Sequence, residues 1–102
     1  MFAKYYEIPF TRYTLPNGKT SNYMFQTTRS DVYDKAKSIL STGTYKFEIE
    51  ILTTGEVSAT IHNKETEVDV AIAVELNVPE LAEAIEQMII NFDVDKDDSK
   101  EE

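Results

Sequence analysis

The most regular hydrophobic pattern in the chain lies in "YKFEIEILTTGEVSATI", residues 45–61. Every second residue from Tyr45 to Ile51 is apolar, and so is every second residue from Val57 to Ile61. A period of two predicts two half-buried strands. If their apolar side chains share one face, Ile51 lies opposite Val57, and a three-residue loop ending in Gly55 joins the strands. Such a loop favours glycine at its last position, so turn and pattern both predict a hairpin.

The segment "VDVAIAVEL", residues 68–76, predicts a further strand of the same sheet after a turn at "HNKETE". Alternation along it assigns one set of residues to the core and the other to solvent. The inward set is Val68, Val70, Ile72, Val74 and Leu76, and the outward set is Asp69, Ala71, Ala73 and Glu75.

The N-terminal part reads as two strands, residues 2–14 and 19–27, joined by "LPNG". Pro16 suits the first position of a type I turn closed by Gly18 as a bulge, whereas Asn17-Gly18 alone suits a two-residue type I′ turn. The register therefore stays open by one residue. A slip of one residue changes which side chains meet across the strands.

Helical spacing of apolar residues predicts one helix at about residues 31–41, with Gly43 as its C-terminal cap, and a second within residues 77–92. Asn77 with Glu80 resembles a capping box at the start of the second helix. The predicted fold class is α+β, with elements in the order β-β-α-β-β-β-α and both helices on one face of an antiparallel sheet. We expect residues 1–92 to form a single domain and residues 93–102 to form an acidic disordered tail.

Composition narrows the function classes. The 102 residues include no cysteine, which excludes disulfides and thiolate chemistry, and no apolar run is long enough to span a membrane. We expect a soluble, cytoplasmic protein. The net charge of -9 disfavours nucleic-acid phosphates and favours a basic protein partner. The charge is uneven, because residues 1–47 carry seven Lys/Arg against three Asp/Glu, whereas residues 48–102 carry three against sixteen.

Candidate catalytic chemistry is sparse. His62 is the single histidine, and Ser58 on the same predicted strand lies roughly 13 Å away, beyond hydrogen-bond reach. The predicted pairing instead places Lys46 and Glu67 beside His62. The three glycines are scattered, so no phosphate-binding loop is present. We predict no enzyme activity and no cofactor.

The acidic C-terminal segment superficially suggests calcium. Asp93, Asp95 and Asp97 have the spacing of the first ligands of an EF-hand loop. Asp98, however, takes the position that requires glycine, and the twelfth position falls beyond Glu102. We therefore predict no metal site.

A row of carboxylates is the first candidate for partner binding. The predicted registers place Glu48, Glu50, Glu56, Glu67, Asp69 and Glu75 on the solvent face of the sheet, joined by Glu80, Glu83 and Glu86 on the second helix. Spaced carboxylates attract Lys/Arg clusters and can imitate nucleic-acid phosphates. An ordinary solvated face of an acidic protein is the alternative interpretation.

The N-terminal hairpin is the second candidate, because aromatic and basic residues alternate along it. Tyr13 and Tyr23, with Arg12 and Lys19, form a pattern typical of single-strand nucleic-acid binders. Tyr and Arg are equally favoured as anchors in protein interfaces. Coverage by the helices or by a dimer partner is a further interpretation, and both a monomer and a homodimer fit the sequence.

Three segments, "LPNGK", "YKFEIEILTTGEVSATI" and "VAIAVELNVPELAEAIEQMI", resemble parts of short, uncharacterised proteins of phages and other mobile elements. The resemblance covers about residues 13–92 and consists of a turn, a hairpin and a helix, so it transfers no active residue. By analogy it implies an inhibitor of host defence, anti-CRISPR proteins among them. The first hypothesis is a non-enzymatic interaction protein that binds a basic protein. The alternatives are a small nucleic-acid-binding module and a small structural or assembly component.

Overall fold

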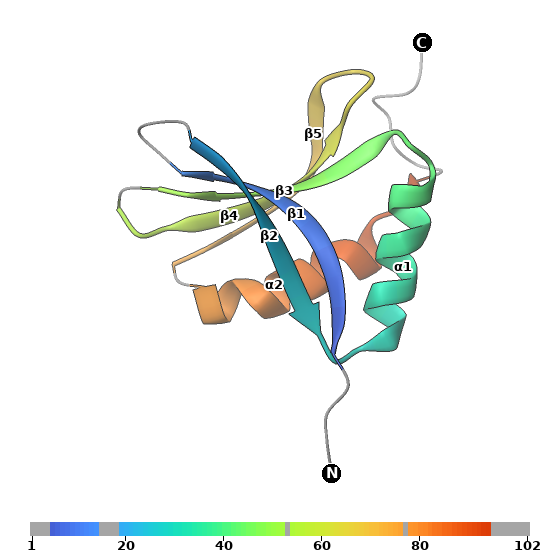
Figure 1. Ribbon diagram of the computed structural model, residues 1–102, viewed down its shortest axis with the longest axis horizontal. Coiled ribbons are helices and arrows are strands. Elements are labelled where there is room, and N and C mark those ends of the chain that lie inside the picture. Colours follow the sequence, from blue (N-terminus) through green and yellow to red (C-terminus); the bar gives the residue numbers. More distant parts are fainter. Residues whose placement is uncertain (1–4, 15–18, 53, 77, 95–102) are drawn as a thin grey trace.

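A computed structural model describes residues 5–14, 19–52, 54–76 and 78–94 of the chain. These residues form five strands and two helices in the predicted order, which confirms the α+β fold class (Figure 1). Along the chain the elements are β1 (Tyr6–Thr14), β2 (Lys19–Thr27), α1 (Ser30–Ser41), β3 (Tyr45–Ile51), β4 (Val57–Asn63), β5 (Val68–Glu75) and α2 (Val78–Asn91).

The strands form one sheet in the order β2-β1-β3-β4-β5. Neighbours are antiparallel except β1 and β3, which run parallel with Thr11 opposite Glu48 and Tyr13 opposite Glu50. The parallel pair arises because α1 connects β2 to β3 and returns the chain in the direction of β1. Local patterns along the chain carry no information on this neighbour relation.

Both helices pack on one face of the sheet, and the hydrophobic core lies between them and the strands. The helices contribute Val32, Ala36, Ile39, Leu81, Ile85 and Ile89, and the strands contribute Ile8, Phe10, Phe25, Phe47, Ile49, Val57, Ala59 and Ile61. The opposite face carries no helix in the described part of the chain, and we call it the open face. It includes Tyr13, Lys46, Glu48, Glu50, Ser58, Thr60, His62, Asp69, Ile72 and Val74.

The predicted hairpin of β3 and β4 is confirmed, with Ile51 opposite Val57. The Leu52 N–H donates to the Glu56 carbonyl at 2.8 Å, and the Gly55 N–H donates to the Leu52 carbonyl at 3.0 Å. Gly55 has a φ of +98°, a conformation that favours glycine. Thr53 lies outside the described residues. The even register places the apolar sets of both strands in the core.

The predicted alternation of β5 is wrong beyond Val70. Asp69 pairs with His62 but Ala71 pairs with Ile61, so β5 has one extra residue there, a β-bulge. Every later side chain changes face because strand side chains alternate. Ile72 and Val74 are 64% and 54% exposed on the open face, whereas Ala71 and Ala73 pack against the core. Two further residues predicted to face inward, Val68 and Leu76, are also exposed.

The N-terminal hairpin pairs Thr14 with Lys19, and residues 15–18 between them, with the predicted turn, lie outside the described residues. Its aromatic side chains divide between core and solvent: Phe10 and Phe25 are buried, and Tyr5 is exposed. The proposed cap at residue 77 and most of the predicted tail, residues 95–102, also lie outside the described residues.

Candidate functional site

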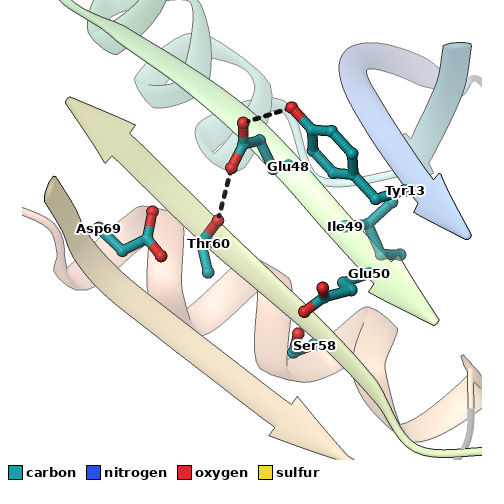
Figure 2. A pocket seen from close by; sticks show the side chains of 7 residues that line it. All are labelled: Tyr13, Glu48, Ile49, Glu50, Ser58, Thr60 and Asp69. Atoms are coloured by element: carbon teal, nitrogen blue, oxygen red, sulfur yellow. Dashed lines mark hydrogen bonds between the residues drawn. The ribbon is translucent and has the colours of Figure 1, made fainter. Parts of the chain in front are cut away.

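A hollow of about 260 Å³ lies on the open face, and residues of four adjacent strands line it (Figure 2). Its lining consists of Tyr13 from β1, Glu48, Ile49 and Glu50 from β3, Ser58 and Thr60 from β4, and Asp69 from β5. Three of these seven residues are acidic. The sheet thus presents carboxylates in a concave surface on the side away from the helices.

Glu48 is largely enclosed, with a side chain only 16% exposed. The Tyr13 hydroxyl donates to Glu48 Oε2 at 2.9 Å, and Lys46 Nζ lies 3.1 Å from the same oxygen. The Thr60 hydroxyl donates to Glu48 Oε1 at 3.5 Å. Burial and the bond to Glu48 raise the pKa of Tyr13, and the bond to Glu48 raises the pKa of Lys46. Glu48 is therefore held in place by three neighbours, one of which, Lys46, is positively charged.

Glu50 and Asp69 are the other two acidic residues of the hollow. Within the described residues, Glu50 has no side-chain hydrogen bond or ion pair, and Figure 2 shows it on the wall beside Ser58. Asp69 faces the hollow from β5 and accepts a hydrogen bond from His62. These two carboxylates are the groups best placed to meet a positive charge from solvent.

His62 stands between two carboxylates. Its Nδ1 lies 2.7 Å from Asp69 Oδ1 and its Nε2 lies 3.2 Å from Glu67 Oε1, and its side chain is 15% exposed. The bond to Asp69, with the weaker contribution of Glu67, raises the pKa of His62. Both nitrogens can donate only in the imidazolium form. The predicted neighbourhood with Lys46 and Glu67 is confirmed, whereas the contact with Asp69 was missed, although cross-strand pairing of β4 and β5 could have indicated it.

This arrangement bears on two kinds of chemistry. Both ring nitrogens of His62 are engaged by carboxylates, so the ring is not positioned to take a proton from Ser58.

Ligand atoms of Glu48, His62 and Asp69 all lie within 4.8 Å of one another, a donor set that can hold a divalent cation. Binding one would require His62 to lose its proton and Lys46 to leave Glu48. The sequence did not indicate this cluster, because its three residues come from three strands.

The structure divides the predicted acidic surface. Glu48, Glu50 and Asp69 line the hollow, Glu56 is half-buried in the β3–β4 turn, and Glu67 is exposed beside His62. The expected position of Glu75 on the solvent face is wrong. It pairs with Val57 and, because of the bulge, lies on the helix side, where it lines a second hollow with Glu80 and Glu83.

Glu86 does not belong to either acidic surface. The Thr27 hydroxyl donates to Glu86 Oε2 at 2.6 Å, and Arg29 lies 3.7 Å from its other oxygen. This carboxylate therefore links α2 to the end of β2.

Tyr13 and Tyr23 lie on opposite sides of the sheet. Tyr13 bonds to Glu48 on the open face, whereas Tyr23 packs against the core with its ring perpendicular to Phe10. Arg12 pairs with Ile49 and also belongs to the helix side. The four residues proposed as a nucleic-acid platform do not share one face, and the side chain of Lys19 lies outside the described part of the structure.

No family model matches the chain, and neither the curated proteins nor the solved structures compared with it gave a match. None of the described helices combines the length and apolar character needed to cross a membrane.

Proposed function

We propose that the chain is a non-enzymatic interaction protein that binds a basic protein through the open face of its sheet. The observation that carries the proposal is the carboxylate-lined hollow on the side that no described helix covers. A Lys or Arg side chain of the partner enters this hollow and pairs with Glu50 and Asp69. The net charge of -9 adds long-range attraction and speeds association.

The surroundings of the hollow suit a protein partner. Ile72 and Val74 lie on β5 opposite Thr60 and Ser58, so exposed apolar side chains border the polar lining. Protein interfaces combine apolar contact area with a few placed polar groups in this way. A purely solubilising surface needs no exposed Ile or Val.

The partner class can be narrowed further. Carboxylates at alternate positions of one strand, such as Glu48 and Glu50, lie about 7 Å apart and form a row of negative charge. Such a row attracts the Lys/Arg clusters with which proteins bind nucleic-acid phosphates. Within the proposal the protein acts in the cytoplasm as a phage-type inhibitor of host defence by occupying such a groove. The resemblance to phage proteins is the support for this part.

The experiment is affinity capture with three forms of the chain as bait: wild type, Glu50→Lys with Asp69→Lys, and the control Glu65→Lys with Asp34→Lys. The two variants have the same net charge, and the control positions are exposed and do not line the hollow. Extract from the organism that encodes the chain is passed over each bait. We expect a basic protein to be retained by wild type and control and lost from the open-face variant.

Two results contradict the proposal. If the open-face variant retains the same proteins as wild type, the hollow is not the contact surface. If retention is lost equally in the control, the binding follows net charge and no particular site is involved. Fluorescence anisotropy with short single-stranded DNA tests the alternative function, and binding at low salt favours the nucleic-acid-binding module instead.

A further inference from the structure

The sheet ends at β5, which has a strand neighbour on one side only among the described residues. We propose that this edge takes an extended segment of the basic partner, which adds to the sheet as another strand. This proposal rests on the proposed function, from which it takes the positive charge of the partner. It adds where on the sheet the partner binds and that the bound segment is extended. The bulge at Val70 interrupts the edge, so the regular part runs from Ala71 to Glu75, about 16 Å.

The open-face side of this edge is apolar. Ile72 is 64% exposed and Val74 is 54% exposed, and both project from the regular part of β5. An exposed edge strand with large apolar residues favours pairing with another strand. Side chains of an added strand that point to the open face would therefore lie against Ile72 and Val74 and gain by being apolar.

The helix side of the same edge is acidic. Glu75 of β5 and the α2 residues Glu80, Glu83, Ala84 and Gln87 line a hollow of about 360 Å³. The α2 residues recur at helical spacing, so they form one stripe. This stripe runs beside the buried stripe of Leu81 and Ile85, and Ala84 in it also packs against the core. Among the described residues that line this hollow, none is Lys or Arg. Side chains of the added strand on this side would gain by being basic.

These two sides define a sequence pattern for the partner. Successive side chains of a strand point to opposite faces of a sheet. A segment that places apolar residues beside Ile72 and basic residues beside Glu75 must therefore alternate apolar and basic residues over about five positions.

A second copy of the chain fits this edge poorly. Neither β5 nor α2 contains a Lys or Arg, so the edge of a second copy supplies no positive charge to match Glu75 and Glu83. Each chain also carries a net charge of -9, which opposes association. Charge complementarity thus selects a basic partner segment over self-pairing.

The test uses a short capped peptide in which Lys and Val alternate, titrated into the ¹⁵N-labelled full chain and followed by amide chemical shifts. One comparison peptide has the same residues in two blocks, and another carries N-methyl groups on alternate backbone amides. We expect the alternating peptide to shift resonances of β5 and α2. N-methylation should weaken binding about tenfold, since a few lost hydrogen bonds of about 1 kcal/mol each suffice for that factor. Block order should weaken binding to a similar extent, because it places Lys beside Ile72 or Val beside Glu75.

Protein variants locate the contact. Ile72→Lys should weaken binding of the alternating peptide about tenfold, whereas Met24→Lys, an exposed apolar position on the other edge strand β2, should leave it unchanged. Equal affinity for all three peptides, no binding at all, or equal effects of the two variants would overturn the proposal. Sedimentation that shows a dimer dissociated by Ile72→Lys would overturn it in favour of self-pairing.

The outcomes for this edge and for the proposed function are separable. Glu50→Lys with Asp69→Lys reverses two charges of the hollow, and it changes no residue of the regular part of β5, residues 71–75, or of the acidic α2 stripe. If these changes leave capture of the basic partner intact while the alternating peptide still binds β5, the open-face function fails and the edge site stands. If capture is lost but the peptide does not bind β5, the open-face function stands and the edge site fails.

Discussion

The bulge in β5 makes a quantitative prediction, because it decides whether Ile72 or its neighbours face the core. Ile72 is 64% exposed, so its truncation removes only about a third of the 1.5–3 kcal/mol that full burial of such a side chain contributes to stability. With the weaker strand preference of alanine, Ile72→Ala should reduce the free energy of unfolding by about 1 kcal/mol. Ile61, directly across the sheet from the bulge, is fully buried. Ile61→Ala should therefore cost about 2–5 kcal/mol.

The assay is urea unfolding of wild type, Ile72→Ala and Ile61→Ala at constant pH, with the slope against urea checked for constancy. The two variants remove the same atoms from strands of one sheet, so their difference isolates burial. A cost for Ile72→Ala as large as that for Ile61→Ala would show that Ile72 faces the core. The regular alternation along residues 68–76 would then hold, and the apolar border of the hollow would not exist.

Three further predictions concern the turn between β4 and β5. The pKa of His62 is raised in the folded protein, so its ion pairs stabilise the fold fully below the unfolded value of 6.5, and this stabilisation is lost as pH rises through the folded pKa. In urea unfolding, wild type should therefore be more stable than His62→Gln by about 1 kcal/mol at pH 6 and should lose this advantage at alkaline pH. A difference that stays constant with pH would contradict the ion pairs. Glu67 has a φ of +62°, so Glu67→Gly should be about 1 kcal/mol more stable than Glu67→Ala in urea unfolding, and the reverse order would exclude this backbone conformation. The buried Asn63 side chain accepts hydrogen bonds from the backbone N–H groups of Glu65 and Thr66 at 2.8 and 3.1 Å. Asn63→Ala should therefore lower the thermal midpoint and reduce the free energy of unfolding by about 2 kcal/mol, and a neutral effect would contradict these bonds.

The part of the fold that could be predicted is the part that local signals determine. Alternation over residues 45–61 and Gly55 at the end of the loop agree with each other, and the observed pairing of Ile51 with Val57 follows from them. The predicted first helix, residues 31–41, differs from α1 by one residue at its start. Its apolar spacing and Gly43, which has a φ of +76°, mark its extent.

The bulge could not be predicted, because the sequence around Val70 contains no glycine or proline that marks one. Apolar residues occupy both alternate sets of this strand, so either set can face the core. The small Ala71 and Ala73 face α2, which contacts β5 closely, and the larger Ile72 and Val74 face solvent. Tertiary packing thus places the small side chains of β5 on the core side and leaves the larger ones in solvent.

The candidate site was predictable only in part. Glu48, Glu50 and Asp69 share one face because each lies on the expected side of its strand, before the bulge takes effect. The bond between Tyr13 and Glu48 depends on the parallel pairing of β1 with β3, which no local pattern indicates. The division of Tyr13 and Tyr23 between the two faces follows from the register of β1 with β2, in which Phe10 lies opposite Tyr23, and the sequence left this register open by one residue.

The central claim is that carboxylates of the open face meet basic residues of a partner protein. Its most direct test is the dissociation constant of the purified partner, measured from low to high salt, for wild type and for Glu50→Lys with Asp69→Lys. Electrostatic contact at the hollow predicts weaker binding by the variant and a shallower dependence on salt than for wild type. Equal affinity and equal salt dependence for both forms would contradict the claim.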